Sequence, residues 1–313
     1  MFFGVDGGGT KTSYAVIGAD GLVRVRHVGP SVSHLAQGFA RATDVLLDGI
    51  VTTLQKATLT PADLTFAFLG LPAYGEDSAT TAQMDLMPAR LFDIPRYRCG
   101  NDMLCSWAGS LACADGISVI AGTGSMAYGE YAGRTARSGG WGEIIGDEGS
   151  AYWIAREGMN LFSRMCDGRA PRGPLYELVR TRLALAVDLD LCAQVYGEGV
   201  SARRAFAGFA PLVHEAAQAG DAQAADIFRH GADELVQCVR AVRRLLQVPE
   251  DIVLPVSSTG GVFQNGGLML EAFRTQLTNV HPPFDYREPQ YQPDIGAALY
   301  AAHLTGLRLT PRV

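Results

Sequence analysis

The sequence predicts an α/β protein built from two similar domains, and three observations lead to that prediction. Its 313 residues allow roughly two domains at about 150 residues each. Hydrophobic residues make up 48% of the chain and charged residues 19%, so the chain can bury substantial cores. A plan of strand, glycine-rich turn and strand appears near residue 2 and returns near residue 116, and strand-like and helix-like segments alternate between and after these units.

The first of the repeated units opens the chain. It begins with a short apolar strand from Phe2, passes through a glycine-rich turn, and adds two extended stretches, TSYAVIG and LVRVRHV. A helix is predicted over 36–56, where apolar residues recur at helical spacing. A strand is predicted over 65–71 and another helix over 78–92. The apolar stretch MLCSWAGSLACA, after a short extended segment, predicts a further helix.

The second unit starts at Gly116, where GISVIAGTGSMAYGEYAGRTARSGG repeats the order of strand, glycine turn and two further extended pieces. Helices dominate after it. Ser150 and Asp221 are predicted to cap two of them, and the second, long helix ends before Pro249. The strand DIVLPVSS leads into another glycine turn, and a last helix follows over 294–305.

These elements predict where the domains divide. We expect a first domain over 1–113, with the C-terminal helix, about 294–313, packing back on it. The second domain is expected over 114–293. No low-complexity linker separates the two.

Charge and cysteine content exclude several classes of partner. The 32 acidic and 26 basic residues leave a net charge of −6, which disfavours binding to nucleic acid or to an anionic membrane surface. No segment approaches the about 20 apolar residues of a membrane span, and the first residues do not resemble a signal peptide. We therefore expect a cytoplasmic protein, and we interpret its six cysteines as reduced core residues because they show no zinc-binding spacing.

The glycine turns can be plain hairpin turns or phosphate-binding loops, because glycine lets backbone amides approach an oxyanion closely. The pattern GxxxxGK[ST] is absent, since Thr10 stands between Gly9 and Lys11. The stretch 122–127 fits GxGxxA, but the residues after it predict a strand where a dinucleotide site needs a helix. The remaining interpretation is a pair of hairpin loops, one in each domain, that hold the phosphates of ATP across a cleft.

Three segments resemble motifs of a known superfamily. Asp6–Thr12, Ala121–Ser125 and Ser258–Val262 are similar, in this order, to the first phosphate, second phosphate and adenosine motifs of actin and the sugar kinases. Gly139–Ala155, GGWGEIIGDEGSAYWIA, resembles the matching stretch of N-acetylglucosamine kinase-like members of the BadF/BadG/BcrA/BcrD ATPase family. The resemblance implies two actin-like ATPase domains, of the ribonuclease H-like kind, around a nucleotide cleft.

The same resemblance implies the cofactors ATP and Mg²⁺ and the residues that bind them. Asp6 would lie near Mg²⁺ through water, although it also suits a turn-stabilising role. Lys11 would add positive charge, unless it is only a solvated residue at a strand edge. The implied nucleotide-binding residues are Gly8, Gly9, Thr10, Lys11, Thr12, Gly122, Thr123, Gly124, Ser125, Gly260 and Gly261.

Asp102 is the candidate catalytic base. It precedes the apolar helix, so a plain N-cap role is the alternative. In the kinases that the sequence resembles, the matching Asp aligns the sugar hydroxyl and takes its proton. With an ordinary pKa of about 3.9, its carboxylate is expected to be ionised at neutral pH.

The resemblance also implies a sugar-binding set. An aromatic ring beside carboxylates suits a sugar, but a buried Trp in a hinge and acids at a helix N-terminus are alternatives. Ser33 stands where these kinases have Asn before His, and 69–73 lacks a hydroxyl residue, so the 2-substituent of the sugar stays open. The predicted substrate-binding residues are Ser33, His34, Asn101, Asp102, Gly140, Trp141 and Asp147.

The sequence thus predicts an ATP-dependent kinase of N-acetylglucosamine or a related amino sugar, acting at O6, and the family resemblance suggests a homodimer. One alternative is an ATPase that activates an acyl-CoA reductase or dehydratase. It would need clustered cysteines for an iron–sulfur cluster, and the nearest pair here is Cys99 and Cys105. The other alternative is a nucleotide or sugar sensor without catalysis.

Overall fold

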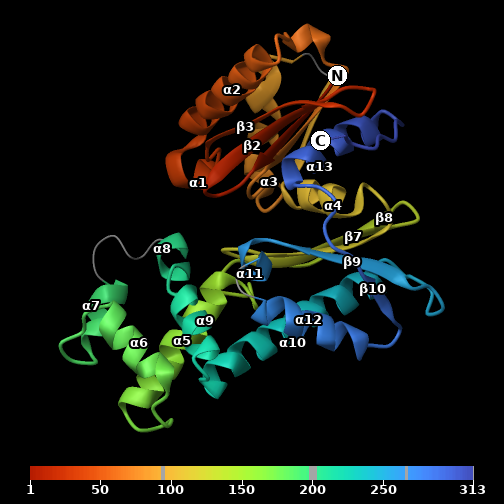
Figure 1. Ribbon diagram of the computed structural model, residues 1–313. Helices are drawn as coiled ribbons and strands as arrows, with labels where there is room; N and C mark the ends of the chain where they lie inside the picture. Colours follow the sequence, from red (N-terminus) through yellow and green to blue (C-terminus); the bar gives the residue numbers. More distant parts are fainter. Residues whose placement is uncertain (93–95, 197–202, 265–266, 313) are drawn as a thin grey trace. The chain divides into compact units, whose positions relative to one another are not determined.

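The computed structural model describes residues 1–92, 96–196, 203–264 and 267–312, and it divides into two compact units (Figure 1). Unit 1 comprises 1–115 and 288–313, and unit 2 comprises 116–287. Within the described residues, each unit contains a five-stranded sheet with parallel and antiparallel pairs, covered by helices. This arrangement confirms the predicted α/β class.

The elements of unit 1 alternate as the sequence predicts. Its strands are β1 (Phe2–Gly7), β2 (Lys11–Ile17), β3 (Val23–Pro30), β4 (Phe66–Leu71) and β5 (Tyr97–Asn101). Its α-helices are α1 (His34–Gln37), α2 (Phe39–Lys56), α3 (Ser78–Leu86), α4 (Met103–Leu111) and α13 (Pro293–Leu304). Two short 3₁₀ helices cover Pro61–Asp63 and Met87–Arg90.

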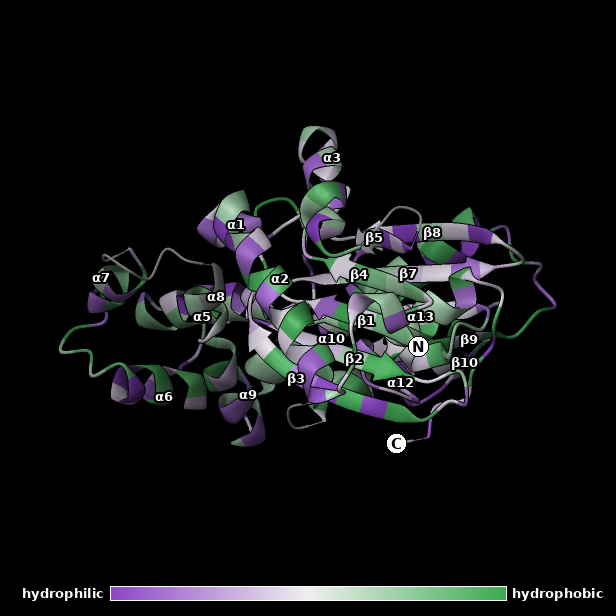
Figure 2. Ribbon diagram, turned by 90° about the horizontal axis from the view of Figure 1, so that it is seen from above, coloured by the Kyte–Doolittle hydropathy of each residue, from purple (hydrophilic) through white to green (hydrophobic). Residues whose placement is uncertain are grey.

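Unit 2 contains the strands β6 (Gly116–Ala121), β7 (Ser125–Tyr131), β8 (Arg134–Gly139), β9 (Leu254–Thr259) and β10 (Phe284–Tyr286). Its helices are α5 (Ala151–Cys166), α6 (Pro174–Arg182), α7 (Asp190–Tyr196), α8 (Arg203–Ala207), α9 (Ala210–Gln218), α10 (Ala222–Leu245), α11 (Gly261–Gln264) and α12 (Leu268–Thr278). In Figure 2, α6 carries both hydrophilic and hydrophobic residues, as expected of a helix that buries one face.

The two sheets have the same topology. The strand order is β3-β2-β1-β4-β5 in unit 1, and in unit 2 it is β8-β7-β6-β9-β10 when read in the same direction. In each sheet, the first strand pairs antiparallel with the second and parallel with the fourth. The internal repeat in the sequence is therefore a repeat of the whole sheet plan, extending beyond the glycine-tipped hairpin.

Both faces of the first sheet are covered. The helix α2 packs against β2 and β3, while α13 packs against β1, β2, β4 and α4. The approach of α13 is so close that a Cβ on Gly4 of β1 would lie 2.2 Å from the backbone N of Ala298. Residues Ile295–Ala302 of α13 are all buried, which matches its nearly continuous apolar sequence.

The capped helices begin where their caps predict. The Ser150 hydroxyl accepts a hydrogen bond from the Trp153 N–H at the start of α5. The buried carboxylate of Asp221 accepts bonds from the N–H groups of Gln223 and Ala224 of α10, and also from the Leu175 N–H of α6. One side chain therefore fixes the N-termini of two helices.

Two predicted helices differ in their bounds, and one cysteine differs in its burial. The helix predicted over 36–56 is divided at Gly38, whose φ of 78° separates α1 from α2. The helix predicted over 78–92 ends as an α-helix at Leu86, and Pro88 in the following 3₁₀ turn cannot donate a backbone hydrogen bond. Cys192 is exposed, so the prediction of six core cysteines is wrong there, although all six are free thiols.

No helix in the described ranges is both long and apolar enough to span a membrane.

Candidate active site

The predicted site residues are divided between the units. Unit 1 holds Asp6, Gly8, Gly9, Thr10, Lys11, Thr12, Ser33, His34, Asn101 and Asp102. Unit 2 holds Gly122, Thr123, Gly124, Ser125, Gly140, Trp141, Asp147, Gly260 and Gly261.

The turn between β1 and β2 presents open backbone. The Gly8 N–H donates to the carbonyl of Lys11 at 2.9 Å, and the Ser31 hydroxyl donates to the Gly8 carbonyl at 2.8 Å. Apart from its chain neighbours, no described residue has an atom within 4 Å of where a Cβ on Gly9 would be, and Gly9, Thr10 and Lys11 are exposed. These hydrogen bonds fix the base of the turn, and its exposed tip leaves room for an anion close to the backbone amides.

The side chain of Thr12 faces the interior. It is fully buried, and its hydroxyl accepts a hydrogen bond from the Val32 N–H at 3.1 Å. Beside it, Ser33 and His34 are both 8% exposed, and the His34 ring stacks on Phe39 with ring centroids 4.4 Å apart. The Nδ1 atom of His34 is buried and has no hydrogen-bond partner among the described residues. A polar ligand group would satisfy this nitrogen.

Asp6 and Asp102 meet at one edge of the first sheet because three strands run in parallel. The strands β1 and β4 pair with Asp6 opposite Gly70, and β4 and β5 pair with Leu71 opposite Asn101. The carboxyl ends of these strands consequently lie together, and Asp102 follows directly after β5. This is the edge at which open α/β sheets bind ligands.

Asn101 fixes the backbone that carries Asp102. Its Oδ1 accepts a hydrogen bond from the Met103 N–H and its Nδ2 donates to the Tyr74 carbonyl, both at 3.0 Å. Asn101 thus takes over the capping of α4, and the Asp102 side chain makes no capping bond. A side-chain capping role for Asp102 is therefore wrong, although the backbone N–H groups of Asp102 and Met103 act on its carboxylate and lower its pKa.

Both carboxyl groups hold protons more tightly than in water. Burial raises the pKa of Asp6 from 3.8 to about 8, and the neighbouring charges of Asp102 and Asp294 add to this rise. The positive charge of Lys11 lowers the pKa and opposes part of the shift. Burial, followed by the charge of Glu76, raises the pKa of Asp102 from 3.8 to about 7. The expectation that Asp102 keeps an ordinary pKa is thus wrong, because it assumed a solvated carboxylate. A base with a pKa near 7 is well matched to proton transfer at neutral pH.

Arg26 and Asp294 also lie near this edge, although no sequence motif indicates them. Asp294 lies in the first turn of α13 and is 2% exposed. Arg26 on β3 donates two hydrogen bonds to its carboxylate, from Nε to Oδ2 at 2.6 Å and from Nη2 to Oδ1 at 2.8 Å. The charge of Asp294 contributes to the raised pKa of Asp6. The partners lie 268 positions apart, so no local pattern could have paired them. Glu76 was missed for a related reason, since it is exposed and lies outside every motif.

A divalent cation fits this edge through Asp6. The described residues include no group of three or more His, Cys, Asp or Glu that could enclose a metal ion. Mg²⁺ in phosphoryl-transfer sites commonly takes one or two carboxylates and completes its shell with water and phosphate oxygens. Asp6 would provide such a carboxylate when a bound cation, by favouring the ionised form, lowers its raised pKa.

In unit 2, hydrogen bonds tie the turn between β6 and β7 to the segment before α5. The Ala151 N–H donates to the Gly122 carbonyl at 2.8 Å, and the Ser125 hydroxyl donates to the Glu148 carbonyl at 2.6 Å. The Gly140 N–H donates to the Ser125 carbonyl at 3.0 Å. Among the described residues beyond its chain neighbours, none has an atom within 4 Å of a Cβ on Gly122, so this turn is also anchored and open.

The segment 139–149 places its two candidate sugar residues differently. Trp141 is 68% exposed, so the alternative of a buried Trp is wrong. Asp147 is 2% exposed and has a φ of 60°, a conformation that Asp tolerates better than most residues. Gly140, with a φ of 71°, lies against Met126, whose Cε would be 3.0 Å from an added Cβ.

The adenosine-like turn lies at the same edge of the second sheet as the turn 122–125. The strands β6 and β9 run in parallel, and Gly260 directly follows the end of β9. A Cβ on Gly260 would lie 2.3 Å from the Ala121 carbonyl oxygen, and its φ is 102°, so only glycine fits. Thr259 beside it has a buried hydroxyl without a hydrogen-bond partner among the described residues. Gly261 begins α11.

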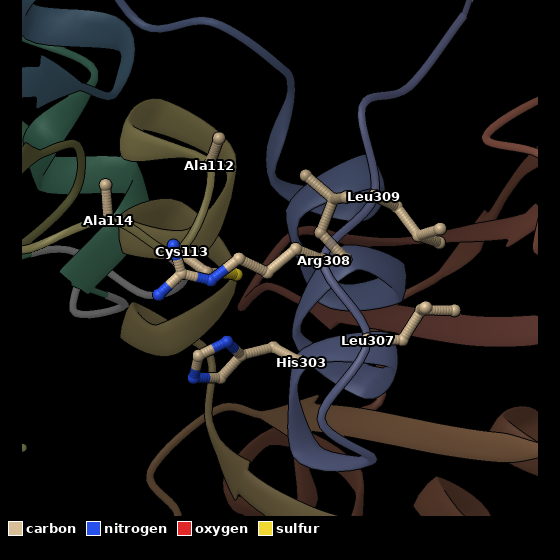
Figure 3. Close-up of a pocket in the computed structure, with 8 residues that line it drawn as sticks. Ala112, Cys113, Ala114, His303, Leu307, Arg308 and Leu309 are labelled. Carbon is tan, nitrogen blue, oxygen red and sulfur yellow. The ribbon is translucent and has the colours of Figure 1, made fainter.

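Two cavities lie away from these loops. One, of about 60 Å³, lies in unit 1 between the end of α4 and the residues after α13, where Cys113, His303 and Arg308 point toward one another (Figure 3). It holds a few water molecules at most and is too small for a sugar. The other, of about 220 Å³, lies in unit 2. Neither is lined by a predicted site residue.

Known proteins with sequences similar to this chain include sugar kinases. The N-acetyl-D-glucosamine kinase of Dictyostelium discoideum is 27% identical over 310 residues, which cover 96% of this chain and 97% of that protein. The N-acetylmuramic acid/N-acetylglucosamine kinase of Clostridium acetobutylicum is 33% identical over 202 residues, covering 64% of this chain and 65% of that protein.

Solved structures support the same relation. The crystal structure of a proposed N-acetylglucosamine kinase from Chromobacterium violaceum has a TM-score of 0.74 at 26% identity and covers 95% of this chain and 97% of its own. The ROK family glucokinase of Streptomyces griseus, solved with glucose and AMPPNP, shares the fold, with a TM-score of 0.57 at 16% identity over 96% and 98% of the two chains. The profile of the BadF/BadG/BcrA/BcrD ATPase family matches residues 3–301, and the chain belongs to this family, as the sequence motifs predict.

Proposed function

We propose that the protein is an ATP- and Mg²⁺-dependent kinase that phosphorylates N-acetylglucosamine or a related amino sugar at O6. The observation that carries this proposal is the position of Asp102. Its carboxylate lies free of capping bonds at the ligand-binding edge of the first sheet, and its pKa is raised to about 7. The whole-length similarity to an N-acetyl-D-glucosamine kinase supports the substrate class.

The side chains divide the chemistry of phosphoryl transfer. Asp102 orients the sugar hydroxyl and accepts its proton as the bond to phosphorus forms. The open backbone at Gly9 and Gly122 binds phosphate oxygens, because no Cβ prevents their close approach. Gly260 and Gly261 form the turn assigned to adenosine. When bound, Mg²⁺ held near Asp6 neutralises charge on the phosphates.

The burial of His34 and the exposure of Trp141 support their assignment to the sugar site. The unpartnered Nδ1 of His34, next to Ser33, suits a hydrogen bond to a sugar hydroxyl or amide. The exposed ring of Trp141 offers a flat apolar face to a pyranose ring. Asp147 is assigned to the sugar only through the family resemblance.

The cysteines argue against the activator of a reductase or dehydratase. Such an ATPase needs thiolates that can reach a shared iron–sulfur cluster. Cys99 is 4% exposed and Cys105 is 0% exposed, and their Sγ atoms lie near the carbonyls of Met84 and Val5. Burial raises the pKa of both thiols, which disfavours the thiolate form that binds iron.

Two measurements test the substrate and the position of transfer. The first follows ADP release with Mg·ATP across glucosamine, N-acetylglucosamine, N-acetylmannosamine, N-acetylmuramate and glucose, and we expect one or two amino sugars to stimulate it. The second replaces the best sugar by its 6-deoxy analogue, which should bind without being phosphorylated. Stimulation by no sugar would overturn the proposed activity, and phosphorylation of the 6-deoxy analogue would overturn O6.

A further inference from the structure

The cavity of about 220 Å³ in unit 2 has a strongly basic lining. It lies where the end of α10, the loop before β9 and the segment leading into β10 come together. Arg240, Arg243, Arg244 and His281 line it, together with the ring of Phe284. Glu250 is the single acidic residue among its lining.

Arg243 places a buried positive charge beside this cavity. It is 5% exposed, and its Nη2 donates to the carbonyls of Pro249 at 2.7 Å and Ile252 at 2.8 Å. Its guanidinium carbon lies 5.3 Å from the centre of the Phe284 ring. No carboxylate in the described ranges forms an ion pair with it, although the charge of Glu250 acts on it at longer range. Arg243 therefore binds the carbonyls of the neighbouring loops and forms no close ion pair with a carboxylate of the described residues.

Arg240 and Arg244 are the accessible cations of the cavity. They are four residues apart on α10, so they lie one turn apart on the same side of the helix. Neither has a carboxylate within 4.0 Å in the part of the chain that the structure describes. Both guanidinium groups are therefore available to a ligand.

Basic residues near the end of a helix often serve only to complement its dipole and its free carbonyls. Here the last carbonyls of α10 already have partners. The carbonyls of Val242, Arg243 and Arg244 accept hydrogen bonds from the backbone N–H groups of residues 246–248, which directly follow the helix. The side chains of Arg240 and Arg244 are not needed for that role.

The cavity is distinct from the predicted nucleotide loops. The turn at Gly260 lies after the last residue of β9, whereas the cavity-lining loop precedes its first residue, Leu254. A strand of six residues separates the two ends by about 17 Å at roughly 3.3 Å per residue. A ligand in this cavity would therefore not occupy the nucleotide site.

We propose that this cavity binds the phosphate group of a small phosphorylated molecule. The guanidinium groups of Arg240 and Arg244, beside the buried charge of Arg243, suit a phosphate, because a phosphate accepts several charge-assisted hydrogen bonds at once. The volume exceeds what a phosphate alone fills, and the Phe284 ring offers an apolar surface to the rest of the molecule. The ligand class is thus a phosphate monoester with a small organic body.

The test is a calorimetric titration of the full-length protein with inorganic phosphate to about 10 mM. The ionic strength is held constant, and chloride is the reference anion. The variant R240Q/R244Q removes the accessible cations and leaves the structural Arg243 in place. The control R156Q/R164Q removes the same number of charges from α5 of the same unit. Melting temperatures without phosphate verify that both variants are folded.

We expect saturable binding in the wild-type protein and in R156Q/R164Q, weakened about tenfold or more in R240Q/R244Q. The proposal is overturned if no binding is detected, since the cavity then has no phosphate site. It is equally overturned if the response survives in R240Q/R244Q, which would assign it to the turns 8–12 and 122–125. Equal weakening in both variants would show general charge screening and would also overturn it.

Discussion

Replacing Asp102 by Asn is expected to stabilise the ligand-free protein. The folded protein raises the pKa of Asp102 from 3.8 to about 7, so at pH 8 folding forces an ionised carboxylate into a site that prefers the neutral form. Each pKa unit corresponds to about 1.4 kcal/mol. The shift therefore sets an upper limit of about 4 kcal/mol for the penalty at pH 8, and the neutral, equally sized Asn avoids it.

The sign of the pH dependence follows from the direction of the shift. A raised pKa means that the folded state binds the proton more tightly, so the resulting stability is complete below the unfolded pKa and is lost as pH rises through about 7. At pH 5 the wild-type carboxyl group is mostly protonated in the folded state. The advantage of Asn should then fall to about 2 kcal/mol, roughly half of its value at pH 8.

Urea unfolding of the ligand-free protein, followed by circular dichroism at pH 8 and pH 5, measures both quantities. Asp44→Asn, an exposed substitution on α2, is the matched control and should change the free energy of unfolding little at either pH. If Asp102→Asn is no more stable than the wild type at pH 8, or if its gain does not shrink at pH 5, the electrostatic description of this edge is wrong.

The geometry leads to four further predictions. Gly122→Ala should leave the melting temperature unchanged, because nothing lies near the added methyl group, but it should raise KM for ATP about tenfold in steady-state assays. Gly260→Ala should instead destabilise the protein by about 2 kcal/mol or more in urea unfolding, because its Cβ would collide with the Ala121 carbonyl. Asp221→Ala should cost about 3 kcal/mol by the same measurement, since three N–H groups, two of them in buried bonds, lose their acceptor; an unchanged unfolding midpoint would contradict this. In pH–rate profiles, kcat/KM should fall about tenfold per unit below pH 7 as Asp102 is protonated, and a flat profile from pH 5 to 8 would refute its role as base.

Much of the fold was predictable because the signals are local. Alternating and helical patterns identify the elements, and the repeated glycine-tipped hairpin corresponds to two sheets of identical strand order. Ser150 and Asp221 act as the predicted caps, since capping depends on residues only a few positions apart. The helix break at Gly38 was not predicted, because glycine inside a helical pattern can also remain helical.

The electrostatics of the candidate site could not be predicted from the sequence. The ion pair of Arg26 and Asp294 joins the two ends of the chain, and only the packing of α13 on the first sheet brings them together. The raised pKa of Asp102 depends on burial and on Glu76, which lies outside every recognised motif. The motifs indicate the residue types at the site, whereas tertiary structure determines their charge states.

The most direct test of the account is transfer of the γ-phosphoryl group from ATP to N-acetylglucosamine by the wild-type protein, Asp102→Asn and Asp44→Asn under identical conditions. We expect transfer by the wild type and by Asp44→Asn, and a loss of at least about a hundredfold in kcat for Asp102→Asn while the protein remains folded and binds ATP. Near wild-type transfer by folded Asp102→Asn would contradict the assignment of the catalytic base.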